Sequence, residues 1–157
     1  MLTVRDLTPE DAPAVLPMVE EFYHSDAVDH PVDPAVLERS FRAAADPAEP
    51  LLRGLLIQWD GAPAGYLYIT QCYSAEVGGR CVLLDEVYLR PELRGRGIGT
   101  QIMAWLKRSY PSACRFRLEV TRANQGAVRL YQKAGYEFLH YDQMVLDIDP
   151  TKERRTT

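Results

Sequence analysis

The sequence lacks any apolar run long enough to cross a bilayer, and its first residues lack the basic-then-apolar pattern of a secretion signal. Cysteine is scarce as well. Cys72, Cys81 and Cys114 form no C-x-x-C pair and no cluster with histidine, which argues against a metal site. They lie in apolar, strand-like segments, so we expect reduced, buried thiols. These absences predict a cytoplasmic protein with no metal and no membrane partner.

Positive charge is also in short supply. The 157 residues contain 18 Lys and Arg against 22 Asp and Glu, which gives a net charge of −4. General nucleic-acid binders are usually basic, so we expect no nucleic-acid partner. The length fits one domain with a real core, and the apolar fraction of 46% is that of a globular protein. We expect a single domain over residues 1–150 and a polar tail over residues 151–157.

Hydrophobic periodicity and turn residues predict strands that alternate with helices. The stretch "DGAP" predicts a hairpin turn between two of the strands. Thr8, Pro9 and Asp11 predict the start of the first helix, with a capping hydroxyl, a proline in the first turn and an acid three residues on. The predicted elements are, in chain order, "LTVRDL", a helix over 8–23, a helix over 34–45, "LLRGLLIQW", "AGYLYITQCY", "RCVLLDEVYL", "IGTQIMAWLKRSY", "FRLEV", "NQGAVRLYQKAGY" and "YEFLHYDQMVLDI". The last of these is expected to form two short strands or one bent strand. The order β-α-α-β-β-β-α-β-α-β-β predicts a mixed α/β sheet.

Three glycines alternate with arginines between an apolar strand and an amphipathic helix. The run comprises Arg94, Gly95, Arg96, Gly97 and, after Ile98, Gly99. Glycine lets the backbone turn tightly and approach a ligand closely, and the amides at a helix start attract anions. Arginine side chains add charge-assisted hydrogen bonds. The pattern therefore predicts a site for a phosphate-bearing ligand in a protein that is acidic overall.

Two common nucleotide motifs do not match this loop. The Walker pattern requires Gly-Lys-Ser/Thr, and the chain has no Gly-Lys dipeptide. The dinucleotide pattern G-x-G-x-x-G fails because Thr100 stands where its last glycine would fall. A solvated glycine-rich turn is the simplest alternative. The position of the arginines between strand and helix favours the anion site.

The stretch "VYLRPELRGRGIG" resembles the acetyl-CoA signature R/Q-x-x-G-x-G/A of the GNAT N-acetyltransferase superfamily, with Arg94, Gly97 and Gly99 at its fixed positions. The later stretch "FRLEVTRANQGAVRLYQKAGYEF" is similar to that family's strand, Asn-led helix and Leu-Tyr-x-x-x-Gly-Tyr/Phe ending. Together these motifs span residues 83–138. The resemblance implies a mixed, mostly antiparallel sheet flanked by helices, in which two central strands splay apart to admit pantetheine.

The same resemblance implies acetyl-CoA as cosubstrate and no metal. Main-chain groups around Val87 and Leu89 would pair with the pantetheine arm as an added strand does. The amides from Gly95 to Gly99, that of Ile98 included, would bind the pyrophosphate. Asn124 matches the asparagine that lies beside the cofactor at the start of the later helix.

Acetyl transfer to an amine needs a deprotonated amine, a polarised thioester carbonyl and a proton for the leaving thiolate. Tyr131 matches the family tyrosine that serves as general acid; a packed aromatic beside Leu130 is the alternative. Asp85 and Glu86 are neighbours on a predicted strand, so they point to opposite faces. We favour Glu86 as the base, with its pKa raised by burial, over Asp85. A mechanism without a side-chain base stays open.

In the family, the amino-terminal helices form one wall of the acceptor pocket. Here they end in "EEFYHSDAVDH", an acidic and aromatic stretch suited to a cationic amine. Its candidate substrate-binding residues are Tyr23, His24, Asp26 and Asp29. A solvated helix end and loop is the alternative.

These inferences together predict an acetyl-CoA-dependent N-acetyltransferase that acts on a small amine by direct transfer. A protein lysine or N-terminal acetyltransferase is one alternative, and a non-catalytic CoA-binding regulatory module is another. A homodimer, in which the apolar strands near the carboxyl end pair between chains, is compatible with the sequence but is not required by it.

Overall fold

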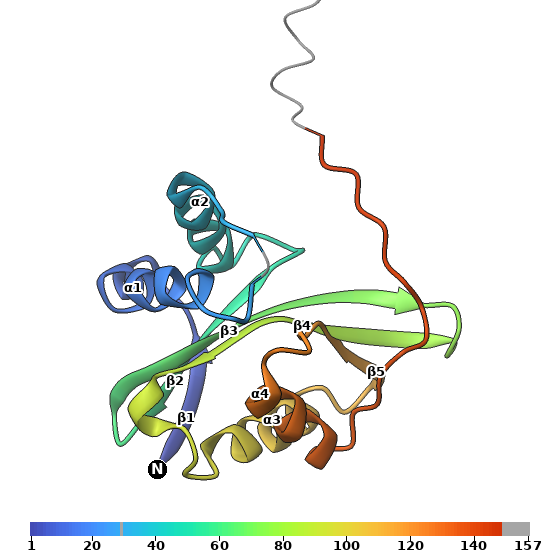
Figure 1. Ribbon diagram of the computed structural model, residues 1–157. Coiled ribbons are helices and arrows are strands. Elements are labelled where there is room, and N and C mark those ends of the chain that lie inside the picture. The colour runs from blue at the N-terminus through green and yellow to red at the C-terminus, as the bar shows by residue number, and fades with distance from the viewer. Residues whose placement is uncertain (29, 149–157) are drawn as a thin grey trace, which may run out of the picture.

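The computed structural model describes residues 1–28 and 30–148, and it shows one mixed sheet with helices on both faces (Figure 1). The strands lie in the order β1-β2-β3-β4-β5; only β4 and β5 are parallel. Helices α1 and α2 cover one face, and α3 and α4 cover the other (Figure 1). The elements are β1 Leu2–Asp6, α1 Ala12–Tyr23, α2 Pro34–Ala44, β2 Arg53–Trp59, β3 Ala62–Ser74, β4 Gly79–Leu89, α3 Ile98–Ser109, β5 Ala113–Leu118 and α4 Gln125–Lys133, with short 3₁₀ turns at Pro9–Asp11 and Pro91–Leu93.

The hairpin between β2 and β3 turns at the predicted place. Asp60 has φ 50° and Gly61 has φ 81°, both in the left-handed region. Two-residue hairpins favour this geometry because its twist matches that of the strands, and Asp-Gly is a preferred pair for it. The turn aligns Leu55 with Leu67 and Leu56 with Tyr66 across the two strands.

Strand alternation divides the apolar side chains into two cores. Leu55, Ile57, Leu67 and Ile69 form one core with residues of α3 and α4, among them Ile102 and Tyr131. The intervening strand residues Leu56, Tyr66 and Tyr68 face α1 and α2, where they meet Val15, Met18 and Phe41. Cys81 is buried as expected, but Cys72 and Cys114 are exposed, so the expectation of three buried thiols was wrong. Cys72 lies near the end of β3 and Cys114 near the start of β5.

A bulge in β4 changes which face its side chains reach. Tyr68 pairs with Glu86 and Ile69 pairs with Leu84, so Asp85 is an extra residue with no partner in β3. Such a bulge shifts the alternation of the strand by one residue. Leu84 therefore packs with the α3/α4 core, whereas Glu86, two residues later, lies on the α1/α2 face beside Tyr66.

The parallel pairing of β4 and β5 ends early. The last aligned pair is Leu84 with Leu118, although β4 continues to Leu89. Residues 86–89 are thus paired only with β3, and their other edge has no strand partner in the described part of the chain. This is the predicted splayed strand pair. Together with the sheet order and the flanking helices, it confirms the predicted fold class.

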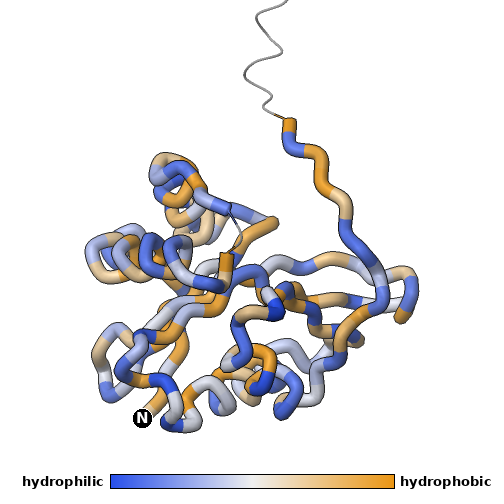
Figure 2. The backbone as a smooth tube through the Cα atoms, in the orientation of Figure 1, coloured by the Kyte–Doolittle hydropathy of each residue, from blue (hydrophilic) through white to orange (hydrophobic). Residues whose placement is uncertain are grey.

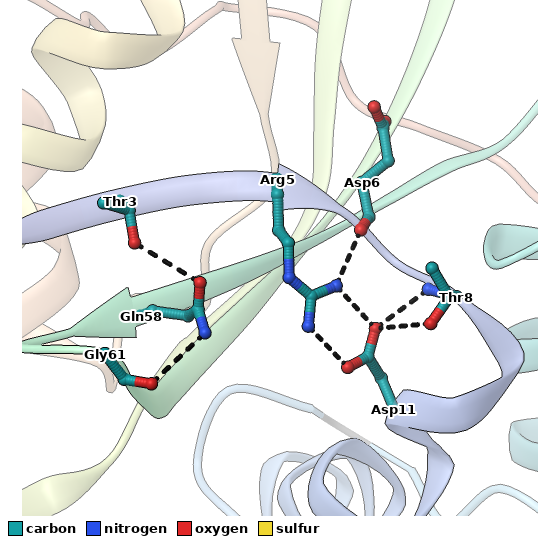
Figure 3. Close-up of polar contacts among 7 residues, drawn as sticks. All are labelled: Thr3, Arg5, Asp6, Thr8, Asp11, Gln58 and Gly61. Atoms are coloured by element: carbon teal, nitrogen blue, oxygen red, sulfur yellow. Dashed lines mark hydrogen bonds and ion pairs between the residues drawn. The ribbon is translucent and has the colours of Figure 1, made fainter.

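The start of the first helical segment is tied to β1 by a charged cluster (Figure 3). Asp11 accepts hydrogen bonds from the Thr8 amide at 2.9 Å and the Thr8 hydroxyl at 3.2 Å. Both carboxylate oxygens of Asp11 also bind the Arg5 guanidinium, at 2.8 and 2.7 Å. The predicted pairing of Thr8 with an acid three residues later is confirmed. Helix α1 then runs through Pro17 to Tyr23, the predicted last residue.

The carboxyl-terminal segment departs from the prediction. Residues 136–148 form no strand, and their second half runs away from the sheet (Figure 1). Hydrophobic alternation creates a strand only where another strand accepts its backbone hydrogen bonds, and this segment has no such partner within the described chain. The predicted polar tail, 151–157, lies outside the described residues. Over the part of the chain that the structure covers, no helix is long and apolar enough to span a bilayer.

Candidate active site

The stretch of β4 that lacks a β5 partner carries a buried carboxylate, Glu86. Glu86 is only 8% exposed. Its Oε1 accepts a hydrogen bond from the Tyr23 hydroxyl at 2.5 Å, and its Oε2 accepts one from the Tyr66 hydroxyl at 2.7 Å. Tyr23 is the last residue of α1, and Tyr66 lies on the neighbouring β3. Three elements thus converge on one carboxyl group.

Burial and hydrogen bonding act in opposite directions on Glu86. Burial raises the pKa of its carboxyl above the ordinary value, the two tyrosine hydrogen bonds lower it, and the charge of Asp85 raises it. Burial, and then the nearby Glu86 carboxylate, raises the pKa of both Tyr23 and Tyr66, so both phenols remain protonated donors. The result is a carboxyl group held in a fixed position, with its pKa displaced toward neutrality.

Asp85, the second candidate base, occupies the bulge and is exposed. Partial loss of hydration and then the charge of Glu119 raise the pKa of Asp85. No hydrogen-bonded partner holds its side chain among the described residues. The structure thus places the two predicted carboxylates in different surroundings, and Glu86 has the more defined geometry.

Tyr131 lies on the opposite face of the sheet from Glu86. Its side chain is 7% exposed and packs in the α3/α4 core, where its ring centroid lies 6.0 Å from that of Tyr136. Burial raises the pKa of its phenol, so the hydroxyl is held in the protonated form that a general acid requires. Tyr131 also lines a groove of about 680 Å³ between β5, α4 and residues 134–143, hereafter the β5 groove.

The glycine-rich loop forms an uncapped helix start. Gly97 is the N-cap of α3 with φ 75° and ψ 3°, and Gly95 has φ 75°. Both values lie in the left-handed region, where a side chain costs about 1–2 kcal/mol. The first backbone bond of the helix runs from the Gln101 amide to the Gly97 carbonyl, at 3.2 Å, and no side chain caps the turn. The amides of residues 98–100 therefore point out of the helix as donors for an anion.

The glycines of this loop have two different roles. A Cβ on Gly95 or Gly97 would meet no atom within 4 Å, so these two serve the backbone conformation and leave the space before the helix open. A Cβ on Gly99 would lie 2.8 Å from a Leu130 methyl carbon, so Gly99 allows α3 to pack closely on α4. The Ile98 side chain is buried in the core, which leaves only its amide for a ligand.

Two predicted cofactor residues already have partners within the fold. Arg94 is exposed; its Nε donates to the Leu89 carbonyl at 2.8 Å, and its guanidinium lies 5.5 Å from the Tyr88 ring centroid. Asn124 is the N-cap of α4, and its Oδ1 accepts from the Ala127 amide at 3.2 Å. Arg96 is exposed on the glycine-rich loop. Val87 and Leu89 lie on the stretch of β4 that pairs with β3 but has no β5 partner on its other edge among the described residues.

The predicted acceptor residues separate into two groups. Tyr23 reaches Glu86, whereas His24 is exposed with its Nδ1 2.7 Å from the Glu20 carbonyl oxygen, and Asp26 is exposed. Asp29 lies outside the described residues. The Thr121 hydroxyl donates to the Asp26 carbonyl at 2.6 Å, so the chain after β5 is bound to the chain after α1. Sequence reasoning missed Tyr66 and Thr121, because nothing in their local patterns distinguishes them from other strand and loop residues.

Comparison with known proteins agrees with this geometry. The model of the acetyltransferase (GNAT) family matches residues 15–136. The chain belongs to the GNAT family. This membership confirms the predicted N-acetyltransferase and argues against the alternative of a non-catalytic module.

Individual relatives share less than a third of their residues with this chain. A thialysine N-ε-acetyltransferase from Mus musculus is 29% identical over 146 residues, which are 87% of this chain and 84% of the mouse protein. A crystal structure of a possible acetyltransferase from Clostridium difficile 630 superimposes with a TM-score of 0.77 at 16% identity and covers 95% of this chain and 99% of its own. The structure of AAC(6')-Iy in complex with the bisubstrate analogue CoA-S-monomethyl-acetylneamine gives a TM-score of 0.71 at 14% identity, over 95% and 99% of the two chains.

Proposed function

We propose that this GNAT protein transfers the acetyl group of acetyl-CoA directly to the primary amine of a small molecule. The observation that carries the proposal is the buried Glu86 carboxylate, fixed by Tyr23 and Tyr66 beside the unpaired edge of β4. A carboxylate with a raised pKa and a defined orientation is suited to accept a proton from an ammonium group.

Acetyl-CoA fits the residues around β4 and α3. The open helix start at Gly97 offers amide donors to the pyrophosphate, and the exposed Arg96 adds positive charge there. The free edge of residues 85–89 offers backbone donors and acceptors to the pantetheine arm in the manner of an added strand. The Nε of Arg94 donates to the Leu89 carbonyl. Arg94 would bind a phosphate either after it breaks this hydrogen bond or through the other nitrogens of its guanidinium group.

Glu86 and Tyr131 divide the proton transfers of the reaction. Glu86 accepts a proton from the bound ammonium, directly or through a water, and frees the lone pair on nitrogen. The nitrogen attacks the thioester carbonyl carbon and the C–N bond forms. The nitrogen then loses its second proton to water, and the C–S bond breaks. The leaving thiolate takes a proton from the Tyr131 hydroxyl, which is restored by a proton from water. Because Glu86 lies on the α1/α2 face and Tyr131 on the α3/α4 face, amine and thiol approach the carbonyl from opposite sides of the sheet.

The aromatic surroundings of Glu86 favour a slender cationic acceptor. Phe22, Tyr23 and Tyr66 pack edge to face next to the carboxylate, with ring centroids 5.3 and 6.4 Å apart. Aromatic faces attract an ammonium group, and the carboxylate supplies the opposite charge. The mouse relative is named for an ε-amino acceptor, which supports an alkyl primary amine as the class of substrate.

The test is a panel of amines assayed by release of the CoA thiol. It should contain lysine, thialysine, a diamine, an aminoglycoside and a lysine-containing peptide, with mass spectrometry of the acetylated product. We expect turnover with at least one small alkyl amine and a strong loss in Glu86→Gln. Turnover with the peptide alone would replace the small acceptor by a protein acceptor. Tight acetyl-CoA binding without any acetylated product would refute the proposal.

A further inference from the structure

Two of the three cysteines lie directly opposite each other on neighbouring strands. In the antiparallel pairing of β3 with β4, Cys72 aligns with Cys81. Opposite residues of an antiparallel pair point to the same face of the sheet, and their Cα atoms are about 4.5 or 5.5 Å apart. Both separations fall within the range of about 4.4–6.8 Å that a disulfide requires. The register of the two strands therefore provides the backbone geometry for a bond between the two sulfurs.

The pair belongs to the closed end of the hairpin that β3 and β4 form. β3 ends at Ser74 and β4 begins at Gly79, and the Gly78 amide donates to the Ala75 carbonyl across the turn, at 3.3 Å. Apolar and polar residues are interspersed at this end, which lies away from α1 and α2 (Figure 1 and Figure 2). Because the hairpin holds the two thiols together before they react, closing a bond between them costs little further chain entropy.

The two thiols differ in their access to solvent. Cys72 is exposed, whereas Cys81 is only 1% exposed. Burial raises the pKa of the Cys81 thiol and the adjacent Cys72 thiol raises it further, while Arg117, in the β5 groove, and Arg115 lower it. An exposed thiol beside a buried one matches the roles of an attacking and a resolving cysteine. Cys72 can meet a molecule in solution, and Cys81 can react with a sulfur that Cys72 holds beside it.

The third cysteine provides an internal comparison. Cys114 has no aligned partner in β4, because the pairing passes from Ala113 to Arg115. Its sulfur occupies the space that Gly79 leaves free, since a Cβ on Gly79 would lie 2.3 Å from it. Cys114 is exposed as Cys72 is, but it has no cysteine opposite it. It represents an accessible thiol without a resolving partner.

We propose that Cys72 and Cys81 form a thiol–disulfide exchange site for low-molecular-weight disulfides. The Cys72 thiolate attacks one sulfur of the small disulfide, a mixed disulfide forms at Cys72, and the other half leaves as a thiolate. Cys81 loses its proton to water and attacks the Cys72 sulfur. The Cys72–Cys81 bond forms, and the second half leaves as a thiolate. The protein loses two electrons and two protons, and the small disulfide is reduced to two thiols.

The bond would join β3 to β4 on the hairpin side of the bulge at Asp85, in the strand that carries Glu86. It is reversible, because Cys72 is exposed and its sulfur can be attacked by a small thiol. The exchange site does not depend on the proposed acetyl transfer, and its test needs no substrate of that reaction.

Oxidised glutathione is the probe for the test. Reduced wild-type protein is incubated with it, the remaining free thiols are blocked with iodoacetamide, and the protein is digested and analysed by mass spectrometry without reduction. We expect a peptide that links Cys72 to Cys81 and a simple glutathione adduct at Cys114. Cys114→Ser is the matched background, in which the product should contain an intramolecular disulfide and no glutathione.

Two further variants in the Cys114→Ser background separate the two steps. Cys81→Ala should stop the reaction at a stable glutathione adduct on Cys72. Cys72→Ser, a change at an exposed position, should keep the circular dichroism of the parent and leave Cys81 unmodified. If Cys72 and Cys81 are both recovered as free thiols in wild type, whether or not Cys114 carries glutathione, the proposal is wrong. A stable adduct on Cys72 beside a free Cys81, or a bond between Cys81 and Cys114, would overturn it equally.

Discussion

Replacing Tyr66 by phenylalanine should raise the pKa of Glu86 without moving the carboxylate. Tyr66 is fully buried and donates to Glu86 Oε2 at 2.7 Å, so no water can take over this hydrogen bond without a rearrangement. A hydrogen bond to a charged group contributes about 1.5–3 kcal/mol, and 1.36 kcal/mol corresponds to a tenfold change in a proton-binding constant. The titration of Glu86 should therefore move upward by about one to two pH units in Tyr66→Phe.

Tyr68 provides a matched control for this experiment. It lies on the same face of β3, is 1% exposed, and its hydroxyl has no hydrogen-bond partner among the described residues. Tyr68→Phe removes the same atom from the same strand, yet takes no hydrogen bond from Glu86. Tyr68→Phe should leave the pKa of Glu86 unchanged. It should stabilise the fold slightly, because it removes a buried hydroxyl that has no hydrogen-bond partner among the described residues. Tyr23→Phe should have a smaller effect than Tyr66→Phe, since Tyr23 is only half-buried and water can reach its position.

Two assays report the titration. Carbon NMR of labelled glutamate follows the carboxyl carbon directly, and Glu86→Gln identifies its signal. The acid limb of kcat/KM against pH reports the same group in the free enzyme, because Glu86 must be ionised to accept the proton. We expect this limb to lie above the ordinary range for glutamate and to move higher still in Tyr66→Phe. If the pKa of Glu86 is the same in Tyr66→Phe as in wild type, or rises equally in Tyr68→Phe, the Tyr66 hydrogen bond does not control the pKa of Glu86.

Three further predictions concern the loop, the acid and the first helical turn. Gly97→Val should weaken acetyl-CoA binding as measured by calorimetry. Gly78 has the same left-handed backbone and open surroundings but lies away from the loop, so Gly78→Val should cost about 1–2 kcal/mol of folding stability and leave acetyl-CoA affinity unchanged. If the two variants bind acetyl-CoA with equal affinity, the loop is not part of the cofactor site. Tyr131→Phe should lower kcat by ~10²-fold or more with little change in acetyl-CoA affinity. If kcat is unchanged while the chemical step limits the rate, Tyr131 is a packing residue and not the general acid. Hydrogen bonds from Arg5 lower the pKa of Asp11, so the stability that this pair contributes is present above the ordinary aspartate pKa and is lost as pH falls through the lowered one. Denaturant melts should show that Asp11→Asn costs about 1–3 kcal/mol at neutral pH and progressively less in acid, and a constant cost at all pH values would contradict this assignment.

Local signals in the sequence were sufficient for most of the fold. Asp60-Gly61 marked the hairpin, Thr8 and Asp11 marked the first helical turn, and the alternation of glycine with arginine located the uncapped start of α3. Each of these features depends on residues close in sequence, whose propensities act without the rest of the chain. For the same reason the element order and the mixed sheet could be predicted.

The arrangement around Glu86 depended on contacts that no local pattern shows. Strict alternation places Glu86 on the same face as Leu84, and only the bulge at Asp85 turns it toward Tyr23 and Tyr66. A bulge is set by the pairing of two strands and leaves little trace in either sequence. The prediction for the carboxyl-terminal segment was wrong for a related reason, since alternation predicts a strand but does not show whether another strand lies beside it.

The most direct test of the central claim is the rate of acetyl transfer to the preferred amine by wild type and Glu86→Gln at neutral pH. Both substrates should be saturating, and the affinity for acetyl-CoA should be measured in parallel. Glutamine keeps the shape and the hydrogen-bonding oxygen of the side chain but cannot take a proton. We expect a loss of ~10²-fold or more in kcat with acetyl-CoA affinity unchanged. A Glu86→Gln protein that acetylates the amine at the wild-type rate would show that the buried carboxylate is not the base.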